Sequence, residues 1–195
     1  MTQESIKGAV LVAVTDDLCR LIEAGRLSRD ALEVKLEPRD LGILDSKVQL
    51  ALWYPIDSYD RLLQALVDVE GGRDPVEFLR NRGRKAAARL AAAGVYAQLR
   101  GDGKPATLDL AQVKRTLSLW GALVNFSRFH CELESEEPRV LRIDVTEARK
   151  FSWLLRRANW GFLEAVLSGL AQRPVSVAIE DEHPERFTYR VRVSR

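Results

Sequence analysis

The chain has few of the residues that build catalytic and metal centres. Its 195 residues include only two histidines and two cysteines, and Cys19 and Cys131 lie far apart in the sequence. Two separate thiols cannot form a zinc knuckle or a disulfide framework, so we expect free thiols in a reducing cytoplasm. The sequence therefore predicts no metal site and a cytoplasmic location.

Long apolar runs are also missing. The N-terminal apolar segment is interrupted by Thr15, Asp16 and Asp17, and it has neither a basic region before it nor a cleavage site after it. We expect neither a signal peptide nor a transmembrane helix. The net charge of +2, with 46% hydrophobic and 30% charged residues, is typical of an ordinary globular protein and favours no particular partner.

Motifs of catalysis and phosphate binding are absent. There is no Gly-x-Ser-x-Gly and no His-Glu-x-x-His, and residues 101–104 lack the glycine spacing of a phosphate loop. His130, Glu132 and Glu134 share one side of an expected strand, where cross-strand ion pairs explain the carboxylates better than acid–base chemistry does. We predict no catalytic residue and no cofactor, and we do not expect an enzyme.

Hydrophobic residues recur at helical spacing over the first two thirds of the chain. The pattern predicts a short helical turn after Ser28 and a loop with one helical turn over residues 36–54. Alanines and glycines over residues 74–99 predict that another element packs very close to this region. Longer helices are expected over residues 4–25, 56–70, 74–99 and 107–125.

The hydrophobic period changes from 3.6 to 2 after Asn125. Two hairpins are expected, and together they predict a four-stranded antiparallel sheet with one solvated face. The element order predicts an α+β fold with a helical layer packed on one face of that sheet. We expect a single domain over residues 1–195, with residues 1–50 as a candidate N-terminal helical arm. The alternating segments are residues 126–135, 139–145, 175–180 and 186–193.

A helix over residues 147–170, capped by Thr146, is expected to organise the rest of the chain. It carries two apolar stripes and therefore needs two partners. Its second stripe suits a protein interface, where Trp and Arg are enriched, or an apolar ligand pocket. Burial against the protein's own helices is the third explanation. The candidate interface or pocket residues are Trp153, Arg156, Trp160, Leu163 and Leu167.

Basic residues cluster in the 74–99 helix. Arg80, Arg84 and Arg89 form a candidate basic face that would contact nucleic-acid phosphates or acidic lipid headgroups. A solvated helix face is the simpler interpretation, because Asp74 and Glu77 lie nearby and the chain is nearly neutral.

Several short segments resemble a myxobacterial protein family of unknown function. They are Trp53-Tyr54-Pro55 before a helix, residues 78–83 with their glycine, residues 159–164, and a strand ending at residues 187–191. The chain is similar also to the superfamily of heme nitric-oxide-binding domains, four-vinyl-reductase-type domains and TRAPP small subunits. That resemblance implies a helical layer against a four-stranded antiparallel sheet.

The resemblance implies a protein that binds small apolar ligands or protein partners. Its heme-binding members have a histidine on the proximal helix and a Tyr-x-Ser-x-Arg motif, whereas His130 and His183 fall in an expected strand and turn. Metal-binding members use cysteines, and Cys131 stands alone. The resemblance therefore carries over a fold but no cofactor and no catalytic residue.

Three functions fit these observations. The first is a non-enzymatic binding module in signalling, which acts through protein–protein interaction as a homodimer or in a hetero-complex with a signalling protein, with an apolar small-ligand pocket as an option. The second is a ligand or gas sensor domain of the fatty-acyl or heme type. The third is a nucleic-acid or membrane-surface binder that uses the basic helix, with nucleic acid the least favoured partner.

Overall fold

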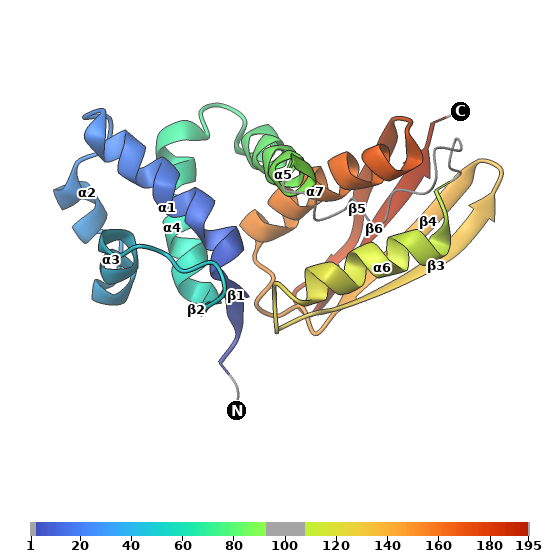
Figure 1. The fold of residues 1–195 in the computed structure, drawn as a ribbon, viewed down its shortest axis with the longest axis horizontal. Coiled ribbons are helices and arrows are strands. Elements are labelled where there is room, and N and C mark those ends of the chain that lie inside the picture. Colours follow the sequence, from blue (N-terminus) through green and yellow to red (C-terminus); the bar gives the residue numbers. More distant parts are fainter. Residues whose placement is uncertain (1–2, 93–107, 195) are drawn as a thin grey trace. The chain divides into compact units, whose positions relative to one another are not determined.

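The structure, a computed structural model, describes residues 3–92 and 108–194 (Figure 1). The chain forms two compact units. Unit 1 comprises Met1–Leu79 with Leu123–Asn125, and unit 2 comprises Arg80–Ala122 with Phe126–Arg195. The predicted end of the 74–99 helix and residues 101–104 lie outside the described residues.

Unit 1 is built on two helices whose leucines are buried. Leu11 and Leu18 of the first helix, and Leu62 and Leu66 of the fourth, have no exposed surface. Ser28 starts the second helix as predicted, because its Oγ accepts a hydrogen bond from the Ala31 amide. The elements are β1 (Ser5–Lys7), α1 (Gly8–Glu23), α2 (Arg29–Glu33), α3 (Pro38–Asp45), β2 (Trp53–Pro55) and α4 (Ile56–Glu70).

Two expectations for unit 1 were wrong. The first helix begins at Gly8, because Ser5–Lys7 forms a strand that pairs antiparallel with Trp53–Pro55. The region expected to be mostly loop contains the full helix α3, whose capping box joins Glu37 and Asp40. By contrast, α4 has the predicted bounds, since Pro55 sets its entry and Gly71 follows its end.

Unit 2 holds the predicted antiparallel sheet, with strand order β3-β4-β6-β5. Helices α6 and α7 pack on one face of it, α6 on β3 and α7 mainly on β5 (Figure 1). The predicted α+β fold is confirmed. Its elements are α6 (Leu110–Gly121), β3 (Arg128–Glu136), β4 (Arg139–Thr146), α7 (Trp153–Ala171), β5 (Val175–His183) and β6 (Arg186–Val193), preceded by α5 (Pro75–Ala92), which begins in unit 1.

The central helix α7 begins six residues later than expected. Its N-cap is Ser152, whose Oγ accepts from the Leu155 amide at 3.2 Å. Thr146 is instead the last residue of β4, and Glu147 has a φ of 54°, in the left-handed region that cannot start an α-helix. Residues 147–151 therefore connect β4 to α7 as a loop.

Aromatic rings fill the space between the helices and the sheet in unit 2. Phe151, just before α7, meets three rings edge to face, and the contacts continue to a ring on β6 and to one on α6. Such pairs add specific geometry to apolar burial. The cluster consists of Trp120, Phe126, Phe129, Phe151, Phe162, Phe187 and Tyr189.

Within unit 2, α5 and α7 cross at two glycines. A Cβ at Gly83 would lie 1.8 Å from the Ala158 carbonyl oxygen, and one at Gly161 would lie 1.9 Å from the Arg80 carbonyl oxygen. Only glycine permits this approach, so the close packing predicted for this helix is confirmed. Among the described helices, none is both long enough and apolar enough to cross a membrane.

Candidate ligand-binding groove

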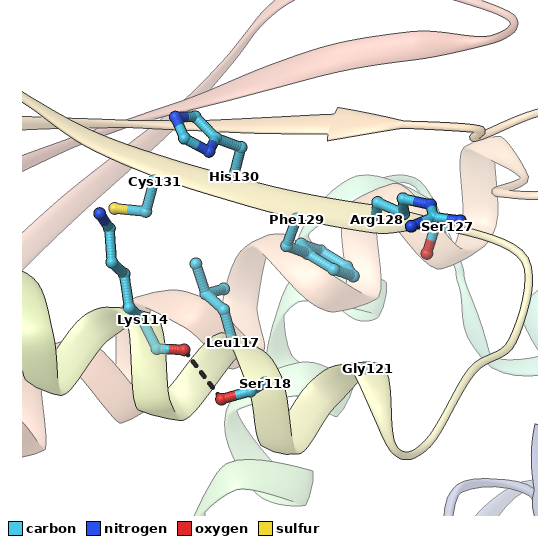
Figure 2. Close-up of a pocket in the computed structure, with 9 residues that line it drawn as sticks. All are labelled: Lys114, Leu117, Ser118, Gly121, Ser127, Arg128, Phe129, His130 and Cys131. Carbon is cyan, nitrogen blue, oxygen red and sulfur yellow. Dashed lines mark hydrogen bonds between the residues drawn. The ribbon is translucent and has the colours of Figure 1, made fainter.

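A groove of about 500 Å³ lies in unit 2 between α6 and the first half of β3 (Figure 2). The helix and the strand run side by side in opposite directions, so the early residues of α6 face the later lining residues of β3. The lining residues are Lys114, Leu117, Ser118, Gly121, Ser127, Arg128, Phe129, His130 and Cys131.

The floor of the groove is apolar, and its helical wall is made of small residues. Leu117 and Cys131 are buried, and Phe129 is half-buried against the aromatic cluster. Ser118 and Gly121 are exposed on α6 three residues apart, so they lie along one edge of the helix. A Cβ at Gly121 would meet no heavy atom within 4 Å, which shows that the groove is open there.

The charged groups of the groove lie towards its ends. Figure 2 shows the Lys114 amine near the thiol of Cys131. Burial raises the pKa of the Cys131 thiol to about 11, although the charge of Lys114 acts in the opposite direction. The thiol is therefore neutral at physiological pH, and Lys114 contributes positive charge without an anionic thiolate beside it.

The other end of the groove is polar. The Oγ of Ser127 is buried there and has no hydrogen-bond partner among the described residues. The neighbouring Arg128 donates from Nε to a carboxylate oxygen of Glu147 at 2.7 Å. This end therefore contains a buried hydroxyl, while the guanidinium already holds an anion.

Neither histidine is directed into the groove. His130 is exposed on β3 and faces away from α6 (Figure 2), with Asp144 opposite it on β4. His183 ends β5, one residue before the turn, and its Nδ1 accepts from the Glu185 amide at 3.3 Å. In residues 3–92 and 108–194, no group of three or more His, Cys, Asp or Glu residues could hold a metal ion.

Two residues of the predicted basic face meet the predicted tryptophan stripe at one carboxylate in unit 2. Arg80 and Arg84 donate to Glu164, each with a contact of 2.9 Å, and Trp160 donates its indole N–H at 3.1 Å. The guanidinium of Arg80 also lies 4.0 Å from the centroid of the Trp160 ring. Arg89 is exposed on a later turn of α5. The structure thus brings together Arg80, Arg84 and Trp160, which the sequence had assigned to different surfaces.

Arg156 ties α7 to the hairpin of β5 and β6. Its guanidinium donates to the carbonyls of Phe151 and His183 at 2.9 and 3.0 Å, and it lies over the ring of Phe187. Burial lowers the pKa of Arg156. The Tyr189 hydroxyl donates to the Arg156 carbonyl at 2.9 Å. The guanidinium and the main-chain carbonyl of Arg156 therefore both bind the hairpin.

The remaining stripe residues separate into core and surface. Leu163 and Leu167 are buried in unit 2, whereas the Trp153 side chain is 43% exposed. A role of Trp153 in a protein interface stays a prediction. The sequence did not lead us to predict the helical side of the groove, which consists of Lys114, Leu117, Ser118 and Gly121. Their i, i+3 and i+4 spacing does place them on one face of a helix.

A second hollow lies in unit 1 and is lined mainly by charged side chains. It lies around α1 and the end of α4, and its arginines form ion pairs, Arg20 with Asp17 and Arg26 with Glu70. Ligand pockets are usually lined by apolar groups with a few polar ones. The groove in unit 2 is therefore the stronger candidate.

No protein-family model and no curated protein matches this sequence. Solved structures of H-NOX domains, however, match nearly its whole length. A Cs H-NOX mutant with an unnatural amino acid has a TM-score of 0.63 at 12% identity, covering 97% of both chains. An Fe(II) unliganded H-NOX mutant from K. algicida has a TM-score of 0.62 at 12% identity and the same coverage.

The chain has an H-NOX-like fold. A Tt H-NOX variant agrees, with a TM-score of 0.59 at 11% identity over 97% of this chain and 96% of that one. The fold predicted from the heme nitric-oxide-binding resemblance is thereby confirmed. Membership of the myxobacterial family, and likeness to four-vinyl-reductase-type domains or TRAPP subunits, stay predictions.

Proposed function

We propose that this chain is a non-enzymatic ligand-sensing domain, which binds a fatty-acyl molecule in the groove between α6 and β3. The observation that carries the proposal is the groove itself, with an apolar floor at Leu117 and Phe129 and an amine at Lys114. The H-NOX-like fold supports a sensor, because H-NOX domains are heme nitric-oxide-binding domains by name.

The lining chemistry matches an amphipathic carboxylate. An acyl chain would cover Leu117 and Phe129, and the carboxylate would bind Lys114 by a charge-assisted hydrogen bond. The neutral thiol of Cys131 would not repel that carboxylate.

The residues present do not fit a histidine-ligated heme. No imidazole points between α6 and β3, since His130 lines the groove but faces away from α6, and His183 ends β5. The Cys131 sulfur, which would have to ionise to bind iron well, has a pKa raised to about 11. Ligand binding in this chain is therefore proposed without heme.

Blocking the groove tests the proposal. We expect palmitate to bind the wild-type protein and Gly121→Leu to weaken it at least about tenfold, because the new side chain enters open space at the groove. Isothermal titration calorimetry measures the change. The matched control is Gly42→Leu in α3, where a Cβ also meets nothing within 4 Å. Equal palmitate affinity in the two variants would refute the groove as the site.

The head-group contact has a separate test. Lys114→Met keeps the length of the side chain but removes its charge, so palmitate should bind about tenfold more weakly while hexadecanol should bind unchanged. A parallel loss for both ligands would mean that Lys114 shapes the groove rather than binding the carboxylate.

Hemin distinguishes the proposal from a heme sensor. Addition of hemin to the purified chain should give no saturable Soret band of a ligated heme. A stoichiometric band would overturn the heme-free proposal, and its loss in His130→Ala or Cys131→Ala would identify the axial ligand.

A further inference from the structure

Unit 1 displays a cluster of apolar side chains on its surface. Of the large hydrophobic residues that are exposed in the described part of the chain, three lie within four positions: Leu50, Leu52 and Trp53. Their exposed fractions are 58%, 49% and 44%. Scattered apolar residues are ordinary on protein surfaces, but a cluster indicates an interaction site.

Three main-chain carbonyls of this loop, residues 49–53, accept hydrogen bonds from within the protein. The carbonyls of Leu50 and Leu52 accept from the Ala9 and Gly8 amides, at 3.0 and 2.9 Å. The carbonyl between them, of Ala51, accepts from the amine of Lys7 at 2.7 Å. Three consecutive carbonyls thus bind the start of α1 and its preceding residue, and they leave the apolar side chains outermost.

The loop is held close to α1 before any partner arrives. A Cβ at Gly8 would lie 2.1 Å from the Gln49 carbonyl oxygen, so only glycine allows the approach. The Gln49 amide donates to the Tyr54 hydroxyl at 2.9 Å. Val48, just before the loop, is buried. A preorganised loop loses little conformational entropy when it binds.

Basic residues flank the apolar cluster. The Lys7 amine lies 4.2 Å from the centroid of the Trp53 ring, and Lys47 is exposed two residues before the loop. Tryptophan and lysine together are typical of segments that lie at the headgroup level of a bilayer, where the ring is amphipathic and the amine meets phosphate.

We propose that the loop of residues 49–53 inserts Leu50, Leu52 and Trp53 into the interface of a phospholipid bilayer. The internal carbonyl bonds favour lipid over a protein partner. Backbone groups that enter a bilayer must be satisfied within the protein, whereas a protein partner can supply hydrogen bonds of its own. This proposal concerns unit 1 and does not depend on the ligand proposed for the groove.

The charge of unit 1 limits the role of anionic lipid. Acidic residues outnumber basic ones in Met1–Leu79, so attraction at the loop is local to Lys7 and Lys47. Apolar insertion therefore dominates, and we expect binding to phosphatidylcholine vesicles, with only a modest gain when phosphatidylserine is added.

Vesicle sedimentation of the full chain tests the proposal. The wild-type protein should pellet with phosphatidylcholine vesicles, and the double variant Leu50→Ser with Leu52→Ser should show a partition coefficient at least about tenfold lower. The matched control is Val34→Ser, which removes an 88% exposed apolar side chain elsewhere in unit 1 and should bind like the wild type. Both changes are at exposed positions, and circular dichroism confirms that the variants fold.

Brominated lipid locates the contact. It should quench part of the tryptophan fluorescence of the wild-type protein, and Trp53→Phe should lose that quenching while it still binds. Absence of wild-type sedimentation, or equal sedimentation of the double and control variants, would overturn the proposal. Self-association without vesicles that the double variant abolishes would overturn it too and would assign the loop to a second copy.

Discussion

The two units present apolar surface in opposite ways. In unit 2 it is recessed between α6 and β3, on a floor of Leu117, Cys131 and Phe129. In unit 1 it projects on residues 49–53, held by the carbonyls of the loop itself. A recess selects a ligand by its shape, whereas a projecting loop suits an extended surface. One chain thereby carries two candidate binding surfaces of different kinds.

The units also differ in how ion pairs support them. Unit 1 buries Asp40, which accepts from Arg61 Nε at 2.5 Å and Nη2 at 3.0 Å. Unit 2 places Glu164 between Arg80 and Arg84, where the glycine crossing of α5 and α7 brings them together. A substitution that breaks the ion pairs of one unit can therefore be compared with a substitution in the other unit.

The largest effect is expected at the glycine crossing of unit 2. Gly83→Ala should lower the free energy of unfolding by about 3 kcal/mol, because the added Cβ meets the Ala158 backbone and the helices must separate. Urea denaturation measures the loss. Gly169→Ala in α7 is the control, since its Cβ would meet open space and should stabilise the helix by up to about 1 kcal/mol. If Gly83→Ala and Gly169→Ala had similar free energies of unfolding, the close approach of α5 and α7 at Gly83 would be contradicted.

Breaking the Asp40–Arg61 pair should have the next largest effect. Arg61→Met should cost about 2 kcal/mol, because it leaves the buried carboxylate without its partner; the 30% exposure of Arg61 keeps the cost below that of a fully buried pair. Thermal unfolding at neutral pH checks this value. Arg39→Met, an exposed arginine on α3, is the control and should change little.

The same pair predicts how acid affects unit 1. Burial raises the pKa of Asp40, but hydrogen bonds from Arg61 and the Glu37 amide outweigh it and hold the pKa below its ordinary value of 3.8. Since the unfolded chain binds the proton more readily, the stabilisation is fully present above that ordinary value and is lost as pH falls through the lower pKa. Asp40→Asn should flatten this part of the stability–pH curve, and an unchanged curve would exclude Asp40 as its cause.

The two cysteines provide one probe in each unit. Cys131→Ser should cost about 1 to 2 kcal/mol because it buries a hydroxyl in an apolar floor, whereas Cys19→Ser at a half-buried site should cost less. Iodoacetamide should label Cys19 before Cys131, whose thiol is buried and has a pKa of about 11. Faster labelling of Cys131 would mean that the groove opens readily.

The smallest stability effect is expected at Trp153. Its side chain is 43% exposed, so Trp153→Ala should change the free energy of unfolding by less than about 0.5 kcal/mol. Trp160→Ala should cost more, because it removes the Arg80 contact and the hydrogen bond to Glu164. If the chain forms a homodimer through this stripe, sedimentation velocity should show weaker association in Trp153→Ala. An unchanged oligomer would rule out that interface.

Local signals predicted α4 and the two hairpins well. Pro55 and Gly71 delimit α4, and strict alternation places Phe129 and Cys131 on the inner side of β3. Helix α3 was missed although its signal was present, since Glu37, Pro38 and Asp40 form a cap, a first helical residue and a capping-box partner.

The start of α7 was predicted wrongly because distant contacts override the local pattern. Phe151 continues the helical spacing of the apolar residues, yet the Ala148 amide donates to the Glu185 carbonyl at 2.9 Å, and Arg149 pairs with the Glu185 carboxylate. These bonds to the turn of the second hairpin hold residues 148 and 149 outside the helix. Helix propensity is weak enough for such tertiary contacts to win.

The sequence by itself determined the order of helices and strands in unit 2, the inward side of each strand of the four-stranded sheet and the positions of both histidines outside the helices. Only the tertiary structure decided that Arg80, Arg84 and Trp160 share Glu164, that small residues of α6 border a groove, and that residues 49–53 project. The physical reason is that periodicity belongs to a single segment and is written in its residues. A groove, a shared carboxylate or a projecting loop depends on how closely segments distant in sequence approach one another, and that distance is set by the packing of the core.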